Sequence, residues 1–216
     1  MRLLDLFCCA GGGAMGYWRA GFTEIVGVDI RPQKRYPFKF VLGDALDYVA
    51  AHGHEFDFIH ASPPCQEYSA LKTVKRKTYA DLVAPTRRAL LATGKPYAIE
   101  NVVGAPLINP LMLCGSMFGL RVQRHRLFET NPLITFSPFS CQHWGRASGM
   151  RPDKHGHRPR RTLSNFAFLT ICGFDFLAEE GRKAMGIDWM VKSELSQAIP
   201  PAYTEWLGRM ILGIIK

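Results

Sequence analysis

The first 21 residues restrict the possible folds more than any other stretch of the chain. A short apolar run at 2–7 is followed by a glycine-rich turn at 8–13 and then by a helical pattern that ends at Gly21. A strand, a glycine turn and a helix in this order form the cradle for a nucleotide or nucleoside in open α/β sheets. The three consecutive glycines do not match the G-x-G-x-x-G spacing that binds a pyrophosphate, and no P-loop lysine follows. We therefore expect a nucleoside without a pyrophosphate at this turn.

Strand and helix patterns continue to alternate along the chain. The predicted strands are 2–7, 24–29, 38–42, 56–61 and 95–99, and the predicted helices are 14–20, 45–52, 81–92 and 202–215. This alternation is typical of an α/β fold with a mostly parallel sheet and helices on both faces. The 216 residues, of which 47% are hydrophobic and 21% charged, are expected to form one domain.

Two acidic residues follow strands of the predicted sheet. Asp29 ends the second strand, where an acid is placed to bind ribose hydroxyls. Asp44 follows the third strand and has two interpretations, as the N-cap of the helix at 45–52 or as the acceptor for an adenine amino group. Both interpretations can hold together.

A cysteine follows the fourth strand on a stiff turn. Pro63 and Pro64 end the strand, because each proline fixes φ and lacks a backbone donor, and Cys65 comes next. Ligands bind at this edge of open α/β sheets, so Cys65 is a candidate nucleophile. The alternative is a small buried hydrophobe, which is the usual role of a free cysteine. Glu100 follows the fifth strand, and its apolar neighbours argue against a fully exposed position.

The charge of the chain indicates a polyanionic partner. The formal net charge is +9, and the stretch 146–161 holds six basic residues and one acidic residue. A basic loop around Lys75 follows Cys65 and is either a solvated surface loop or a mobile flap over a nucleic acid. No apolar run approaches the length of a membrane span, and no signal peptide precedes the first strand. We therefore expect a cytoplasmic monomer with no membrane partner, whose six cysteines are free thiols.

Four motifs resemble one known family. They are 5–13, 62–66, 100–102 and 123–126, and their order and spacing are similar to those of the DNA (cytosine-5) methyltransferases. The resemblance implies a Rossmann-like methyltransferase sheet that binds S-adenosylmethionine. It also implies DNA as the substrate and methylation at carbon 5 of cytosine.

The resemblance further assigns roles to individual residues. It implies that Cys65 adds to carbon 6 of a flipped-out cytosine, that Glu100 holds the edge of that base, and that Arg126, with Arg124, contacts the base or its phosphates. The cofactor-binding residues it implies are Phe7, Gly11, Gly12, Gly13, Asp29, Ile30, Asp44 and Pro64. The substrate-binding residues it implies are Gln66, Asn101, Lys75, Arg158, Arg160 and Arg161.

The C-terminal half is less regular. We expect a catalytic and cofactor-binding core at 1–130, a short basic target-recognition segment at 131–178, and C-terminal motifs that pack back on the core at 179–216. Residues 179–189 and 196–202 are similar to the ninth and tenth motifs of the family, but the usual Gly-Asn after Gln197 is absent. Because the recognition segment is short, we expect phosphate contacts with little sequence selectivity.

Possible metal ligands also lie in the recognition segment. They are Cys141, His143, His155 and His157, with Cys172 as a fifth. Their spacing fits no familiar zinc pattern, so the sequence favours histidines that face phosphates and predicts no metal.

Three functions remain open at this stage. The first is methylation of cytosine in DNA, the second is methylation of cytosine in RNA such as tRNA, and the third is a non-catalytic nucleic-acid-binding relative. The intact Cys65, Glu100 and Arg126 argue against the third. The small size and basic charge are typical of a phage or prophage enzyme, of the kind found in restriction–modification. The sequence leaves open the target site, the base that removes the carbon 5 proton, and a modified transferred group.

Overall fold

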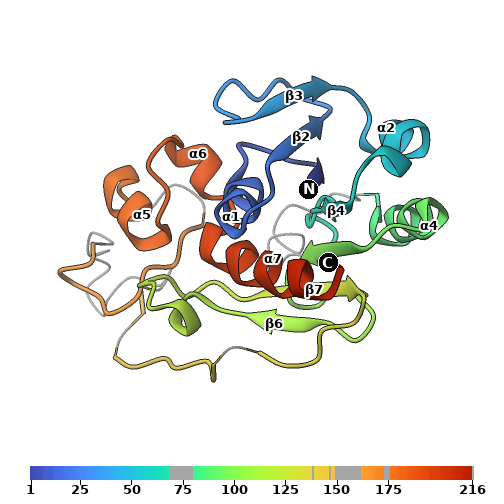
Figure 1. Cartoon of the computed structure of the whole chain (residues 1–216). Coiled ribbons are helices and arrows are strands. Elements are labelled where there is room, and N and C mark those ends of the chain that lie inside the picture. Colours follow the sequence, from blue (N-terminus) through green and yellow to red (C-terminus); the bar gives the residue numbers. More distant parts are fainter. Residues whose placement is uncertain (69–79, 138, 146, 149–161, 173–175, 216) are drawn as a thin grey trace.

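The computed structural model describes residues 1–68, 80–137, 139–145, 147–148, 162–172 and 176–215 (Figure 1). The strands are β1 (Arg2–Leu6), β2 (Glu24–Asp29), β3 (Lys39–Leu42), β4 (Phe58–Ala61), β5 (Tyr97–Asn101), β6 (Leu111–Leu113) and β7 (Arg126–Asn131). The helices are α1 (Gly12–Ala20), α2 (Ala45–His52), α4 (Val83–Thr93), α5 (Ala178–Met185), α6 (Lys192–Leu195) and α7 (Pro201–Ile215). Two 3-10 turns are η1 (Gly53–Glu55) and η2 (Gly115–Phe118).

All seven strands belong to one sheet. Their order is β3-β2-β1-β4-β5-β7-β6, and the first five run parallel to one another. Strand β7 runs antiparallel to both β5 and β6. The predicted α/β fold of the Rossmann-like methyltransferase type, with a mostly parallel sheet, is confirmed.

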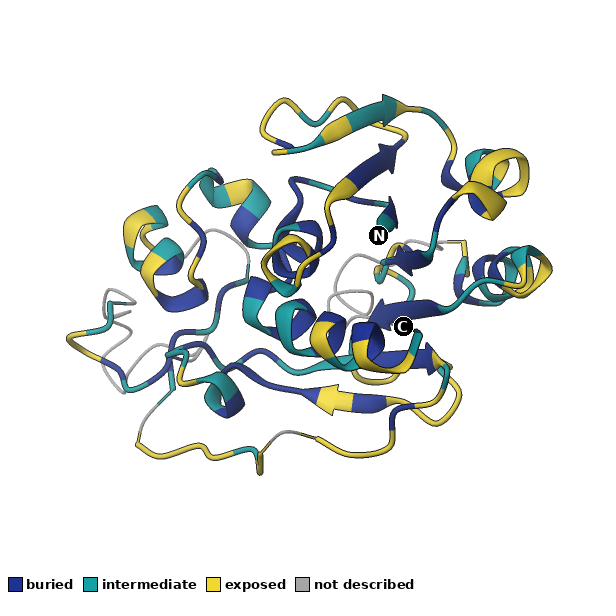
Figure 2. Cartoon of the chain, viewed as in Figure 1, coloured by how far each residue is buried: buried dark blue, intermediate teal, exposed yellow. Residues whose placement is uncertain are grey.

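Alternating side chains of the central strands fill two separate cores. Leu3 of β1 and Phe58 of β4 pack under α1 and α7, whereas Leu4 packs with Ile59 on the opposite face under α2 and α4. This is the two-residue period of a strand buried on both sides. Helices therefore cover both faces of the sheet, as predicted, and the sheet carries the buried layer between them (Figure 2).

Helices α1 and α7 approach each other too closely for a side chain at one position. A Cβ atom on Gly16 would collide with the Thr204 hydroxyl and with the Pro201 carbonyl oxygen. Thr204 uses the same hydroxyl to donate a hydrogen bond of 2.8 Å to the carbonyl of Gly13. Glycine at position 16 is therefore required for the contact between the first and last helices.

A third core joins the C-terminal half to the sheet. Val122, Leu169 and Met185 are buried together in it. Arg121 fastens this region, because its guanidinium donates to the backbone carbonyls of Leu163, Phe166 and Ala167. The predicted division into segments at 130 and 178 stays a prediction. In the described part of the chain, no helix combines the length and apolar character that a bilayer crossing needs.

Candidate active site

The turn after β1 is held by the acid at the end of β2. Asp29 is buried, and its two carboxylate oxygens accept hydrogen bonds from the backbone N–H groups of Cys9 at 3.0 Å and Arg31 at 2.9 Å. Phe7 and Cys9 both have positive φ, of 56° and 45°, although neither is glycine. Backbone strain of this kind costs about 1–3 kcal/mol per residue and clusters at functional sites.

The predicted cofactor residues lie around this turn and along the carboxyl ends of neighbouring strands. Asp44 accepts from the N–H groups of Leu46 at 2.7 Å and Asp47 at 3.1 Å, so the N-cap interpretation is confirmed. Ile30 is 71% exposed directly beside Asp29. Exposed apolar surface next to a carboxylate suits a nucleoside, which has a flat base and ribose hydroxyls.

The three glycines of the turn are packed against the protein on their Cα side. A Cβ atom would meet Pro37 at Gly11, the Ile199 carbonyl oxygen at Gly12 and the His60 ring at Gly13. Gly11 is also the N-cap of α1, with a φ of 79° and no side-chain cap. Glycine therefore lets the turn pack closely against three other parts of the chain, namely Pro37, the segment before α7 and the His60 ring.

Cys65 lies on a braced turn after β4. The side-chain amide of buried Asn101 donates a hydrogen bond of 3.0 Å to the Pro63 carbonyl and accepts one of 2.9 Å from the N–H of Val102. Pro64 and Gln66, on either side of the cysteine, are exposed. Asn101 thus holds the turn that carries the thiol, and the predicted contacts of Gln66 and Asn101 with substrate stay predictions.

Glu100 and Arg126 form a buried ion pair at the same edge. Arg126 Nε lies 2.9 Å from Glu100 Oε1, and the two side chains are 15% and 8% exposed, in the order Arg126 and Glu100. The pairing of β5 with β7 places Glu100 opposite Phe128, which brings the start of β7 over the carboxylate. Burial raises the pKa of Glu100, and Arg126, Ser62 and Arg124 partly offset this rise.

A chain of polar side chains reaches Glu100 from beneath the sheet edge. The Tyr17 hydroxyl lies 3.1 Å from His60 Nδ1, His60 Nε2 lies 2.9 Å from the Ser62 hydroxyl, and Ser62 hydrogen-bonds to Glu100. Tyr17 and His60 are fully buried. No role was predicted for these three residues, although a histidine inside an apolar strand was a visible signal.

The three cysteines near the edge differ in how easily they ionise. Burial and the carboxylates of Asp5 and Asp29 raise the pKa of Cys8 strongly, and burial with the same two carboxylates raises the pKa of Cys9 to about 12. Burial and Glu100 also raise the pKa of Cys65, but Arg126 and Arg124 act to lower it. Because the thiolate is the nucleophile, the charges favour Cys65 over its two neighbours.

The part of the chain that carries Cys65 and Glu100 is similar to a known protein family. Residues 1–105 match the family model of the C-5 cytosine-specific DNA methylases. The first 105 of the 216 residues are therefore similar to this family. The match includes Cys65 and Glu100 and ends before Arg126.

Two solved structures are similar to part of this chain. A candidate DNA modification methyltransferase encoded within an Escherichia coli prophage is 19% identical, with a TM-score of 0.42 over 59% of this chain and 45% of that chain. A conserved hypothetical protein from Streptococcus pyogenes is 15% identical, with a TM-score of 0.38 over 60% of this chain and 84% of that chain. This chain therefore spans less than half of the length of the E. coli protein. No curated protein sequence matches it.

The Arg124 guanidinium is hydrogen-bonded to the protein backbone. Its guanidinium donates to the carbonyls of Ile171 at 2.6 Å and Ser196 at 2.9 Å. Burial, with the nearby charge of Arg126, lowers the pKa of Arg124 to about 9, which leaves it protonated at neutral pH. These bonds join the motif at 123–126 to two C-terminal segments. The predicted contact of Arg124 with a target base stays a prediction.

The basic residues predicted to bind substrate lie outside the described residues. These are Lys75, Arg158, Arg160 and Arg161.

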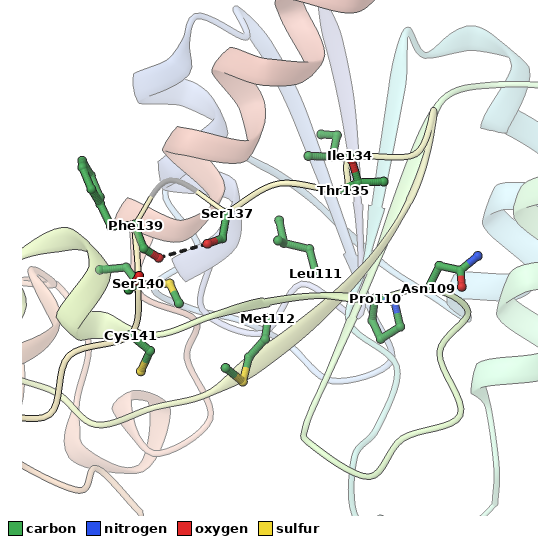
Figure 3. A pocket seen from close by; sticks show the side chains of 11 residues that line it. Asn109, Pro110, Leu111, Met112, Ile134, Thr135, Ser137, Phe139, Ser140 and Cys141 are labelled. Atoms are coloured by element: carbon green, nitrogen blue, oxygen red, sulfur yellow. Dashed lines mark hydrogen bonds between the residues drawn. The ribbon is translucent and has the colours of Figure 1, made fainter.

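A surface cavity of about 440 Å³ lies beside strand β6. Figure 3 shows its lining, which comes from the chain around β6 and from residues 134–141. Cys65, Glu100 and Arg126 do not line it. The cavity is therefore separate from the site that contains Cys65, Glu100 and Arg126.

Proposed function

We propose that the chain transfers a methyl group to carbon 5 of cytosine in DNA. The observation that carries this proposal is the position of Cys65 beside the pair of Glu100 and Arg126, with Cys65 and Glu100 inside the stretch that matches the cytosine-specific DNA methylases. A nucleophile, a carboxyl group with a raised pKa and a fixed guanidinium are the groups that this reaction needs.

Cys65 begins the reaction in this proposal. Carbon 5 of cytosine is a poor nucleophile, so the Cys65 thiolate first adds to carbon 6 and forms a sulfur–carbon bond. The electrons of the ring double bond move to carbon 5, which can then take a methyl group. Arg126 and Arg124 support this step, because their positive charge favours the thiolate form of Cys65.

Glu100 supplies the proton that the ring needs. Electron density grows at ring nitrogen 3 as the thiolate adds, and a protonated Glu100 stabilises it by donating there. Burial raises the pKa of Glu100 and so favours its protonated form. Arg126 lies 2.9 Å from the carboxyl group and would donate to the cytosine carbonyl oxygen.

The cycle closes by elimination. A base removes the proton from carbon 5, the ring double bond forms again, and the bond from carbon 6 to the Cys65 sulfur breaks to release the thiolate. The Cys65 turn and Glu100 lie at a sheet edge that a stacked base cannot reach, so the target cytosine has to flip out of the duplex.

S-adenosylmethionine is the proposed cofactor, and it supplies the methyl group when bound. Asp29 would bind its ribose, because each carboxylate oxygen keeps acceptor capacity beyond its backbone bond. Phe7 and Ile30 would contact the adenine ring, Asp44 would accept from its amino group, and the backbone of the glycine turn and Pro64 would complete the site.

The remaining segments have proposed roles as well. Residues 1–130 form the catalytic core, residues 131–178 recognise the target, and residues 179–216 pack back on the core. Trp189 supports the last assignment, because its indole N–H donates a hydrogen bond of 2.8 Å to the carbonyl of Ala10 in the cofactor turn.

A transfer assay tests the proposed function. The wild type is incubated with S-adenosylmethionine that carries a tritiated methyl group, in parallel with duplex DNA and with total tRNA. We expect label in DNA, recovered as 5-methylcytosine, and none with the variant Cys65→Ala. Cys172→Ser is the matched cysteine control and should keep activity, because Cys172 is a free thiol that takes no part in the proposed reaction.

Two further results decide the outcome of the assay. Glu100→Gln should slow transfer by roughly 10²–10⁴-fold, because the amide cannot supply a proton. Label in tRNA alone would move the substrate to RNA and leave the chemistry in place. Full activity of Cys65→Ala would disprove the proposed reaction.

A further inference from the structure

Four metal-binding side chains converge on one point beside the 123–126 motif. They are Cys114, which precedes η2, His125, which precedes β7, and Cys141 with His143 from the segment after β7. One ligand atom from each lies within 4.8 Å of all the others. This group is the only one of its kind among the described residues, and it lies outside the proposed active site.

The distances between these atoms suit a tetrahedral ion. His143 Nε2 lies 3.3 Å from Cys114 Sγ and 3.1 Å from Cys141 Sγ, and His125 Nε2 lies 3.4 Å from Cys141 Sγ. A tetrahedral zinc ion with ordinary bonds to sulfur and nitrogen separates such atoms by about 3.5 Å. The four side chains therefore need only small shifts to bind one ion.

Outer contacts orient the same side chains. The Ser116 hydroxyl lies 3.6 Å from both Cys114 Sγ and Cys141 Sγ, where it can donate to a thiolate. The Gln123 side-chain amide lies 3.2 Å from His143 Nδ1. When Nε2 binds a metal, Nδ1 carries the proton, and the Gln123 amide can turn its oxygen to accept it. Such outer partners are typical of metal sites.

We propose that Cys114, His125, Cys141 and His143 bind one structural zinc ion. Two thiolates and two imidazoles in a tetrahedral arrangement select zinc among the common divalent ions. Four protein ligands leave no open position, so the ion is structural.

The proposed ion has a definite mechanical role. His125 lies between Arg124 and Arg126, so the zinc ties the start of β7 to residues 141–143. It would thereby hold Arg126 at Glu100 and anchor the proposed recognition segment at residues 141–143. The spacing of the four ligands in the sequence did not predict this site, because only Cys141 and His143 lie close together in the chain. His155 and His157 lie outside the described residues, and Cys172 is not in the group.

Metal analysis of the purified protein tests the proposal without any activity assay. The full chain is expressed without a histidine tag in zinc-supplemented medium, and its zinc content is measured by elemental analysis. We expect one zinc ion per chain in the wild type and in the control Cys172→Ser. Cys141→Ser and His143→Ala, each changed at one ligand, should lose most of it.

Cobalt substitution keeps the test independent of how the variants fold. The wild type is stripped of metal and titrated with Co²⁺, which should give the visible absorption of a tetrahedral ion and a thiolate-to-cobalt charge-transfer band. Gln123→Ala should weaken zinc affinity by about 10–100-fold, because it removes the partner of His143 Nδ1. Gln142→Ala, at an exposed position next to two ligands, should not.

Three results would overturn the proposal. One is a wild type with neither bound zinc nor a tetrahedral cobalt spectrum. Another is a disulfide between Cys114 and Cys141 in protein purified under reducing conditions, found by peptide mass spectrometry. The third is zinc retained at the wild-type level when Cys141→Ser and His143→Ala are combined, because the ion would then lie elsewhere.

Discussion

His60 Nε2 lies 2.9 Å from the Ser62 hydroxyl, and Ser62 in turn hydrogen-bonds to Glu100. The direction in which Ser62 donates to Glu100 places the His60 proton on Nε2 and makes Nδ1 the acceptor of the Tyr17 hydroxyl. The polar chain thus ends on the carboxyl group to which we assign the proton donation. It gives His60, Tyr17 and Ser62 a positioning role that two predictions address.

Removal of the Ser62 hydroxyl should shift the pH dependence of transfer. The bond from Ser62 lowers the pKa of Glu100, so Ser62→Ala should raise that pKa further. Because the reaction needs protonated Glu100, activity falls as pH rises through this pKa, and the fall should move to higher pH. One hydrogen bond to a charged group corresponds to about one to two pH units. The profile of kcat/KM against pH measures the shift.

The conservative variant Ser62→Thr serves as the control for this prediction. It keeps a hydroxyl, so its profile should stay near that of the wild type. An unchanged profile in Ser62→Ala would show that the hydroxyl does not act on Glu100.

His60 should make the protein less stable in acid. Burial lowers the pKa of His60 to about 3, whereas an exposed histidine titrates near 6.5. Between these values the unfolded chain binds the extra proton, so the free energy of unfolding falls as pH drops, by about 1.4 kcal/mol per pH unit from this group. His60→Gln should reduce that slope, measured by urea unfolding from pH 6.5 downward. His54→Gln, at an exposed histidine, should leave the slope unchanged.

A trapped intermediate should identify the nucleophile. The wild type with DNA that contains 5-fluorocytosine should form a covalent adduct, because fluorine replaces the carbon 5 proton and blocks elimination. The adduct should survive denaturation, and mass spectrometry of its peptides should place it on Cys65. An adduct on Cys8 or Cys9 would contradict the assignment. Burial and nearby carboxylates raise the pKa values of these two thiols, which disfavours their thiolate forms.

Loss of the Asp29 carboxylate should weaken cofactor binding. Asp29→Ala removes the proposed ribose acceptor, at a cost of about 1.5–3 kcal/mol for each hydrogen bond removed. Part of the loss should come from the freed N–H groups of Cys9 and Arg31. Titration calorimetry with S-adenosylmethionine measures the effect. Asp47→Ala, in helix α2, is the control, and equal affinities of the two variants would show that Asp29 does not face the cofactor.

The basic recognition segment should bind DNA without strong sequence preference. Replacement of Arg158, Arg160 and Arg161 by alanine should weaken binding to all sequences alike. The slope of log affinity against log salt should fall by about 0.9 for each phosphate that the protein no longer neutralises. Binding of several duplexes at a series of salt concentrations tests this. A weaker affinity for one sequence alone would mean that the segment binds bases.

The sequence predicted the parts of this fold that depend on local pattern. The apolar run that places Leu3 and Leu4 in different cores is visible in the sequence, and so is the glycine turn before α1. Strands β6 and β7 were not predicted, because β6 has three residues and β7 carries a buried Glu129. That glutamate is tolerated by an ion pair of 2.6 Å with Arg87, a partner far away in the chain.

The site was predictable to the same extent. Cys65 follows β4, and Glu100 lies near the end of the parallel neighbour β5, inside a strand that runs to Asn101 and not to 99 as predicted, so the sequence brings both residues to one edge. The bonds of Arg124 to Ile171 and Ser196, and the approach of Cys114 to His143, join distant segments. Long-range contacts of this kind leave no periodic signal in the sequence, and only the folded chain reveals them.

The contact between the first and last helices has a consequence for synthesis on the ribosome. Residues 199–204 fill the space beside Gly12 and Gly16, and α7 closes the core over Tyr17. Residues 1–105 therefore leave the exit tunnel with one face of their sheet covered by α1 but not yet by α7. That face stays partly covered until translation has passed α7. The nascent chain must avoid aggregation through this interval, and its catalytic edge takes its final form only after the last helix has docked.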